Sequence, residues 1–305
     1  MVIILAVAFF FYKAFQNNWA SIQSSKFEIS FLFLFLSFCA ILVTYLLSTY
    51  GWYLAINSLS DGAKISFPQS VATVNASSLV KYLPGKIWSY ALQMYWLVNA
   101  GFSKSLILYV NIVNLFVSMI TSVTVGIAYL LFSSTILPFA ATLSLLLALV
   151  FLDICCVAFP ESINNGVFSF VNRIIHRDIK CFDVSRKLMM DLHRIHFAAA
   201  VSFGIGAYLL CIGFGFHVGR DKILLIMSSF LLSDVIGFLA VIVPGGLGVR
   251  EGVMYLMLGG VMPGSLPLIL PVASRIVNML VDLFLGIIAL RLLRGFMNAH
   301  LAGKE

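Results

Sequence analysis

The chain has 305 residues, of which 61% are hydrophobic and 10% charged, and its mean hydropathy is +1.05. One water-soluble core cannot bury that much apolar surface, so the composition excludes a soluble globular domain and predicts an integral membrane protein. The net charge of +7 suits basic loops held against anionic lipid head groups and gives no specific signal for nucleic acid. We therefore expect one membrane domain over residues 1–305, with membrane lipid as its partner.

In chain order, the apolar runs predict about six full spans, because one crossing takes roughly 20 apolar residues. The predicted spans are a short first helix at 1–15, then 29–56, 105–132, 136–159, 195–216 and 266–293. Two further pairs of segments are interrupted, 68–80 with 87–98 and 223–243 with 246–258. Their shortness, and the polar residues of the first pair, predict two re-entrant or broken helical hairpins. The expected fold class is an all-α polytopic membrane protein.

The segment at 160–194 is the strongly charged loop of the chain, with an excess of Lys and Arg. By the positive-inside rule it is cytoplasmic, and parts of it could form an amphipathic helix on the membrane surface. The last span ends in Arg291 and Arg294, which predicts a cytoplasmic C-terminus. We expect both termini to be cytoplasmic and the membrane to be a prokaryotic inner membrane.

The two interruptions are related by a fixed offset. Pro84-Gly85 and Pro244-Gly245 lie 160 residues apart, and the sequences that follow them can be aligned without a gap. The predicted repeat cores are a hairpin plus a span in each half, at 68–132 and 223–293. Three full spans separate the breaks, so the second hairpin should start from the opposite membrane face. Such an inverted repeat places a substrate site near the midplane and supports alternating access.

Each break presents helix N-termini, whose free N–H groups and partial positive charge favour anions. The second break holds the glycines and ionisable residues that we predict for the site, namely Gly245, Gly246, Gly248, Arg250 and Glu251. Bare backbone and charges inside hydrocarbon are costly unless they line a polar cavity. A local ion pair between Arg250 and Glu251 is the structural alternative.

The first break contributes Lys81 and Lys86, which add full positive charges beside its helix N-terminus. A phosphate or phosphodiester is the natural ligand for such a group of charges. The alternative for both lysines is snorkelling to the head-group layer from an interfacial loop.

The last predicted span has a polar face, because Arg275, Asn278 and Asp282 recur at spacings of three and four residues. We expect Arg275 or Asp282 to meet Arg250, Glu251 or the substrate. The corresponding span in the first half carries Asn111, Asn114 and Ser118 on one face. Hydrogen bonding between helices is the competing explanation for the Asn and Ser positions.

Other polar residues carry weaker signals. His193 and His196 lack ligand-spaced partners and predict interfacial packing rather than a metal site. The five cysteines show no CxxC spacing and are expected to be small buried hydrophobes. Asp153 and Asp234 could relay protons or simply hydrogen-bond near helix ends. Because nucleophile elbows, phosphate-binding loops and paired carboxylates are all missing, we expect no catalytic residue, metal or cofactor.

The strings Lys81-Tyr82-Leu83-Pro84-Gly85-Lys86-Ile87-Trp88 and Pro244-Gly245-Gly246-Leu247-Gly248-Val249-Arg250-Glu251-Gly252 resemble the lysylphosphatidylglycerol synthase/flippase membrane-region family. With the hydropathy pattern, the resemblance covers nearly the whole chain. It implies movement of lipids between leaflets, notably aminoacylated phosphatidylglycerol, and related stand-alone members are linked to glycolipid or polyprenyl-lipid pathways. The soluble synthetase half is absent from this sequence, so we do not expect aminoacyl transfer.

The resemblance and the polar residues together predict a flippase-like transporter of a phosphate-containing lipid. The lipid could be a phospholipid, an aminoacyl-phospholipid or a polyprenyl-linked glycolipid. The main alternative is a membrane subunit that binds a lipid-linked sugar and assists or performs glycosyl transfer. A third possibility is a passive scaffold for a partner enzyme that modifies lipids.

Overall fold

The protein is described from a computed structural model, which covers residues 16, 28–82, 88–133, 138–175, 180–216, 218–240, 246–262 and 265–302. Within these residues all regular structure is helical and no β-strand occurs. Six helices are long and apolar enough to cross a membrane, α3, α6, α7, α9, α10 and α12. The predicted class, an all-α polytopic membrane protein, is therefore confirmed.

The helices occupy α3 (Phe31–Leu59), α4 (Phe67–Ser78), the 3-10 turn η1 (Leu79–Tyr82), α5 (Trp88–Asn99), α6 (Lys104–Ser133), α7 (Phe139–Ala158), α8 (Pro160–Ile175), α9 (Arg186–Gly213), α10 (Arg220–Leu239), α11 (Val249–Gly259) and α12 (Leu266–Ala302). Most lie within a few residues of the predicted segments. Each predicted hairpin arm is a separate helix, and α4, α5 and α11 have only 11 or 12 residues.

Two details of the predicted spans differ from the structure. Helix α9 begins at Arg186, well before the predicted start at residue 195. Ser185 caps it by accepting from the Leu188 N–H, and Met189 and Leu192 in its first turns are buried, so packing continues the helix into the charged segment. Helix α10, predicted as a hairpin arm, is long enough to span by length and composition. The predicted first helix at 1–15 lies outside the described residues.

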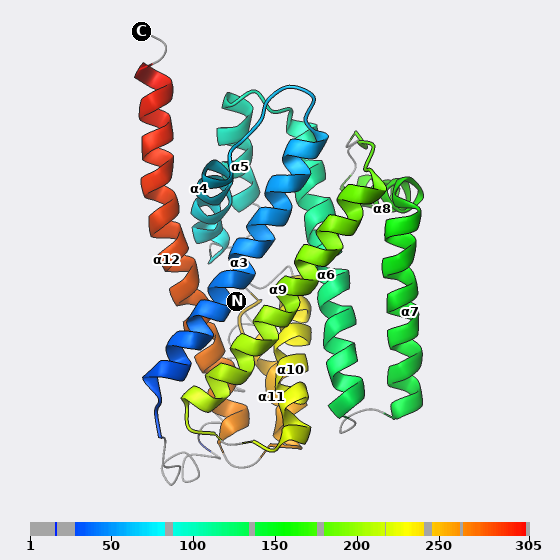
Figure 1. The fold of residues 1–305 in the computed structure, drawn as a ribbon, viewed down its shortest axis with the longest axis vertical. Helices are drawn as coiled ribbons and strands as arrows, with labels where there is room; N and C mark the ends of the chain where they lie inside the picture. The colour runs from blue at the N-terminus through cyan, green and yellow to red at the C-terminus, as the bar shows by residue number, and fades with distance from the viewer. Residues whose placement is uncertain are drawn as a thin grey trace.

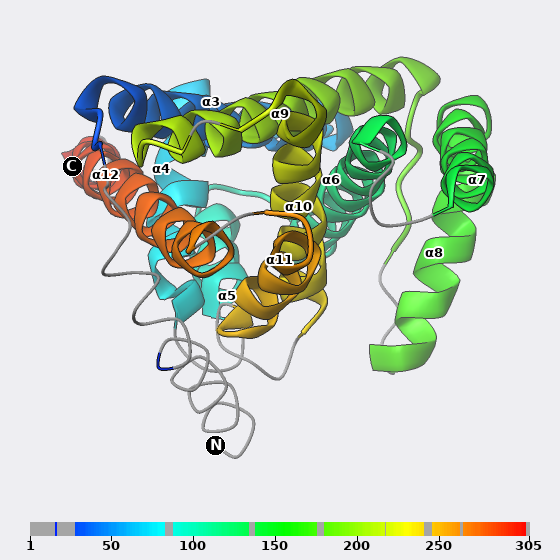
Figure 2. The ribbon, with the colours of Figure 1, turned by 90° about the horizontal axis from the view of Figure 1, so that it is seen from below.

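The long helices α3 and α9 pack along each other and form one layer of the molecule (Figure 2). Helices α4, α6, α10 and α12 lie beneath them, and α7 and α8 stand to one side (Figure 2). The core consists of apolar side chains between these layers, including the fully buried Ile41, Leu210 and Phe230. Helix α7 is long and apolar but mostly unburied within the chain, as expected for a helix that faces lipid.

The two predicted hairpins lie at opposite ends of the bundle. Helices α4 and α5 are in the upper half of Figure 1, and α10 and α11 are in the lower half. Helix α4 packs against α12, and α10 packs against α6, so each hairpin is held by the long helix of the other half. This exchange of partners is compatible with an inverted repeat, and the repeat and the re-entrant character of the hairpins stay predictions.

Two glycines, one in each half of the chain, allow these contacts. A Cβ on Gly126 in α6 would lie 2.9 Å from Leu232 of α10, and one on Gly286 in α12 would lie 2.5 Å from Leu79 beside α4. Gly126 and Gly286 are 160 residues apart, which is the offset between the Pro-Gly breaks. Each half of the chain therefore has one close helix approach at a glycine, at positions separated by the predicted repeat offset.

Candidate functional site

A polar cavity of about 460 Å³ lies between the two hairpins. Its walls come from α3, α4, α5, α6, α9, α10, α11 and α12, so both halves of the chain contribute. Most of the ionisable and amide residues that the sequence places inside apolar segments line it. Five of these lining residues are described below: Asp234, Arg250, Arg275, Asn278 and Asp282.

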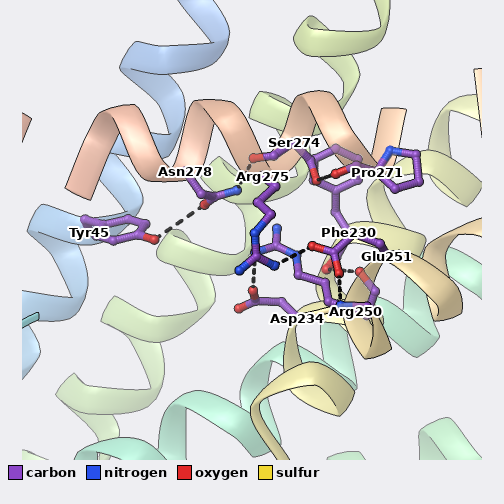
Figure 3. A network of polar contacts seen from close by, with 11 residues as sticks. Tyr45, Phe230, Asp234, Arg250, Glu251, Pro271, Ser274, Arg275 and Asn278 are labelled. Atoms are coloured by element: carbon purple, nitrogen blue, oxygen red, sulfur yellow. Dashed lines mark hydrogen bonds and ion pairs between the residues drawn. The ribbon is translucent and has the colours of Figure 1, made fainter. Parts of the chain in front are cut away.

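Glu251 and Arg275 form a close ion pair at one side of this cavity. Arg275 Nη1 lies 2.6 Å from Glu251 Oε1, and the two side chains are 18% and 7% exposed. The other carboxylate oxygen of Glu251 accepts from the Gly248 N–H at 2.6 Å (Figure 3). Glu251 therefore both caps the N-terminus of α11 and neutralises Arg275 from α12.

Arg250 lies next to this pair but has a different partner. Its Nη1 is 2.9 Å from Asp234 Oδ1 of α10 (Figure 3). Its guanidinium lies over the ring of Phe203, with 5.8 Å to the ring centroid. The side chain is only 11% exposed, yet among the described residues Nε and Nη2 have no hydrogen-bond partner. Two buried donors of this cavity-lining cation are thus unpartnered, and an anion would satisfy them.

The glycines of the second break allow the backbone to pass close to α10. Gly246 has φ of +65°, and a Cβ there would lie 2.5 Å from the carbonyl oxygen of Gly237. A Cβ on Gly237 would in turn lie 2.8 Å from the Cβ of Arg250. Both positions must lack a side chain for α11 to begin where it does, and this approach brings Arg250 beside Asp234.

The polar face of α12 continues along the cavity beyond Arg275. Asn278 Nδ2 donates to the Ser274 carbonyl at 2.6 Å, and the Tyr45 hydroxyl donates to Asn278 Oδ1 at 3.4 Å (Figure 3). Asp282 is 2% exposed and lines the same cavity. The predicted stripe is therefore directed at the cavity and at α3, rather than at lipid.

The opposite wall is built from the first half of the chain and carries amides and hydroxyls. Gln93 Nε2 of α5 donates to Ser77 Oγ of α4 at 2.9 Å. Trp52 Nε1 donates to Asn111 Oδ1 at 3.2 Å. These side chains are joined across helices, as the interhelical hydrogen-bond explanation expects, and they also line the cavity.

Helix α9 contributes His196 to the same wall. Its Nε2 lies 3.1 Å from Asn114 Oδ1, and the residue is 2% exposed. Its Nδ1 has no hydrogen-bond partner, and neither has Oε1 of Gln93. The prediction that His196 packs at the interface was wrong, because the early start of α9 carries this residue into the bundle.

The predicted site residues fall into three groups. Arg250, Arg275, Asn278 and Asp282 line the cavity together. Glu251 does not line it but forms an ion pair with Arg275. Gly246 and Gly248 shape the start of α11. The remaining predicted positions are Lys81, whose side chain is not described, and Lys86 and Gly245, which lie outside the described residues.

Sequence reasoning missed three residues of this cavity. Asp234 had been considered only as a relay or a helix-end acid, whereas it is the ion-pair partner of Arg250. Gln93 and Asn75, in the arms of the first predicted hairpin, were not predicted as site residues, yet both line the cavity. The usable signal was an amide in a short apolar arm, which has no other means of being satisfied in a membrane.

A second polar cluster lies outside the cavity, between α6, α7 and α9. The Thr124 hydroxyl donates to Asp153 Oδ2 at 2.7 Å, and His193 Nε2 lies 3.4 Å from Asp153 Oδ1. That second contact satisfies the distance for an ion pair but not the geometry of a hydrogen bond, since neither atom has a hydrogen-bond partner. Within the described ranges, no group of three or more His, Cys, Asp or Glu could hold a metal.

Comparison with known proteins links this geometry to one family. The family model described as "Lysylphosphatidylglycerol synthase TM region" matches residues 1–286. No curated protein matches the chain. The matched region includes all the residues that line the cavity.

Proposed function

The chain belongs to the lysylphosphatidylglycerol synthase TM-region family, and on that basis, together with the cavity, we propose that it is a flippase-like lipid transporter. It moves a phosphate-containing lipid between leaflets. The head group occupies the cavity while the acyl or prenyl chains stay in the bilayer. The phosphate is bound by Arg250.

The observation that carries this proposal is the state of the Arg250 guanidinium. Desolvating a cation inside a membrane domain is costly, and Asp234 engages only one of its nitrogens. The donors at Nε and Nη2 are buried and unpartnered at the cavity wall. A phosphate accepts two parallel N–H bonds from one guanidinium, which is the bidentate geometry that arginine favours.

The position of the site supports transport between leaflets. Arg250 is in the first turn of α11, where the helix N-terminus adds partial positive charge. The cavity lies between two hairpins held at opposite ends of the bundle (Figure 1). If the two halves form an inverted repeat, as we propose, rocking the unit that contains α4 and α12 against the unit that contains α6 and α10 exposes this site to each leaflet in turn.

The test is lipid translocation by purified protein in vesicles that contain fluorescent phospholipid. The wild-type chain should move the label between leaflets, and Arg250→Ala should slow it by about ten- to hundred-fold, the value of one or two charge-assisted hydrogen bonds. Arg194→Ala is the matched control, because this arginine is 67% exposed and pairs only with Asp191 on the surface. Arg250→Lys should retain part of the rate, since it keeps the charge but not the fork.

Equal rates for wild type and a folded Arg250→Ala variant would overturn the proposal. Sugar transfer to a polyprenyl acceptor by the purified chain alone would replace it with the glycosyl-transfer alternative. Retention of the wild-type melting temperature by Arg250→Ala shows that any loss of rate comes from the site.

A further inference from the structure

The two walls of the cavity correspond position by position. Seven pairs of lining residues are separated by the repeat offset of 160, namely Val74 and Asp234, Ser77 and Gly237, Ser78 and Phe238, Tyr90 and Arg250, Leu115 and Arg275, Ser118 and Asn278, and Ser122 and Asp282. One cavity is therefore lined by equivalent parts of both halves, and the chemistry at equivalent places can be compared directly.

The comparison shows that charge is confined to one half. Four second-half positions in these pairs are ionisable, and all four first-half counterparts are uncharged. Among the described residues, none of the cavity-lining side chains from α3, α4, α5 and α6 is Asp, Glu, Lys or Arg. The first-half wall instead offers amides, hydroxyls, an indole and the imidazole of His196 from α9.

Two buried acceptors on this uncharged wall have no partner. Gln93 is 5% exposed. Its Nε2 donates to Ser77 Oγ, whereas its Oε1 has no hydrogen-bond partner among the described residues. His196 Nε2 faces the side-chain amide oxygen of Asn114, Oδ1, so Nε2 carries the ring proton. The unpartnered Nδ1 is then an acceptor. Buried acceptors left in this state call for donors from a ligand.

A ligand that suits these acceptors donates hydrogen bonds without carrying charge. Hydroxyl groups do this. An ammonium group also donates, but on this wall no described carboxylate would pair with it. The free-energy cost of removing its water would then not be offset by an ion pair. The cavity-lining acids Asp234 and Asp282 belong to the other wall, as does Glu251 beside it, and Asp234 and Glu251 pair with arginines.

We infer that the first-half wall is a subsite for an uncharged polyol, a sugar or cyclitol attached to the phosphate that Arg250 binds. This inference rests on the proposed function, since it specifies the second part of the same head group. The cavity volume of about 460 Å³ falls within the range of small-molecule sites, roughly 300–1,000 Å³. The shared ligand chemistry is a phosphate joined to a polyol, either on a lipid or as a free sugar phosphate.

The experiment compares binding of three short-chain lipids to purified protein in detergent: phosphatidic acid, phosphatidylinositol and phosphatidylethanolamine. Wild type should bind phosphatidylinositol at least about tenfold tighter than phosphatidic acid, the value of one or two hydrogen bonds. Gln93→Leu should remove most of that preference, because it should weaken phosphatidylinositol binding more than phosphatidic acid binding. Free inositol phosphate as a competitor separates the sources, because a lipid site should resist displacement and a soluble-metabolite site should not.

Gln93→Glu is a second variant for which we expect a gain in binding of one lipid, and a misfolded protein could not show that gain. A carboxylate on the uncharged wall should shift the preference about tenfold toward phosphatidylethanolamine, whose ammonium then has a counterion. Equal binding of phosphatidic acid and phosphatidylinositol by wild type would overturn the polyol subsite, as would an equal loss for both in Gln93→Leu. In either case, weakening of every lipid by Arg250→Ala would leave the proposed function standing. If Arg250→Ala weakened none of them, the proposed function itself would fail.

Discussion

The two walls of the cavity have related positions but different chemistry. The wall from α10, α11 and α12 concentrates ionisable side chains and pairs them, as with Arg275 and Glu251. The wall from α4, α5 and α6 places neutral side chains at the corresponding positions, for example Tyr90 where the other half has Arg250. Lining positions recur at an offset of 160 residues, whereas the charge does not.

This difference separates scaffold from function. Small residues that let helices approach occur in both halves, as at Gly126 and Gly286. The side chains that face the cavity differ between the halves, as the proposed binding of an asymmetric lipid head group would require. Four changes, ordered by expected effect, test this view.

The largest effect should come from Arg275→Ala, which breaks the charged wall at its most buried pair. Glu251 is 7% exposed and would keep its charge without a counterion. We expect a loss of about 3 kcal/mol in unfolding free energy, the usual cost of removing one partner of a buried pair. Reversible unfolding in mixed detergent micelles measures it.

The double variant Arg275→Ala with Glu251→Gln is the control for that loss. It removes both charges, so it should be more stable than Arg275→Ala alone. A double variant that lost the sum of the two single effects would show that the pair is not coupled.

Gly246→Ala should have the next largest effect, because it disturbs the start of α11 and with it the position of Arg250. The residue has φ of +65° and no room for a Cβ beside Gly237. Left-handed backbone and the contact together should cost about 2 kcal/mol. Thermal unfolding detects the change. Gly252→Ala in the same segment is the matched control, since its Cβ would meet nothing within 4 Å. A destabilised Gly252→Ala would contradict this account.

The paired glycines test the repeated packing with a smaller effect. Gly126→Ala and Gly286→Ala should each lose about 1 kcal/mol, since crowding by a methyl group outweighs the better helix propensity of alanine. Unfolding of both variants under the same conditions gives the comparison. Leu232→Val should relieve Gly126→Ala but not Gly286→Ala, because Leu232 contacts only the first of them. Relief of both would mean that the two contacts are not independent.

The smallest effect should come from Asp234→Asn, which removes one negative charge from the charged wall and leaves the pair of Arg275 and Glu251 intact. Asp234 holds one nitrogen of Arg250, and its side chain is 52% exposed, so the pair contributes little. Removing its charge should tighten phosphatidic acid binding by about two- to five-fold. Weaker binding would instead mean that Asp234 is needed to orient Arg250.

The sequence was sufficient to predict the fold class, most helix limits and the polar face of α12, because hydropathy and helical spacing determine these locally. It also pointed to a partner for Arg275 beyond its own helix, and the structure has Glu251 in that place. The pairing of Arg250 with Asp234 could not be predicted, because it depends on how α10 and α11 close on each other at Gly237. The early start of α9 was missed because charged residues in its first turns concealed a buried face.

The interaction of each hairpin with the other half determines which helices can move as a unit. Since α4 packs on α12 and α10 on α6, the chain cannot hinge between its first and second halves without losing both contacts. A motion that preserves them carries α4 with α12 and α6 with α10, so each mobile body combines segments distant in sequence. Cysteine pairs placed across α4 and α12 should therefore crosslink at every stage of the proposed transport cycle.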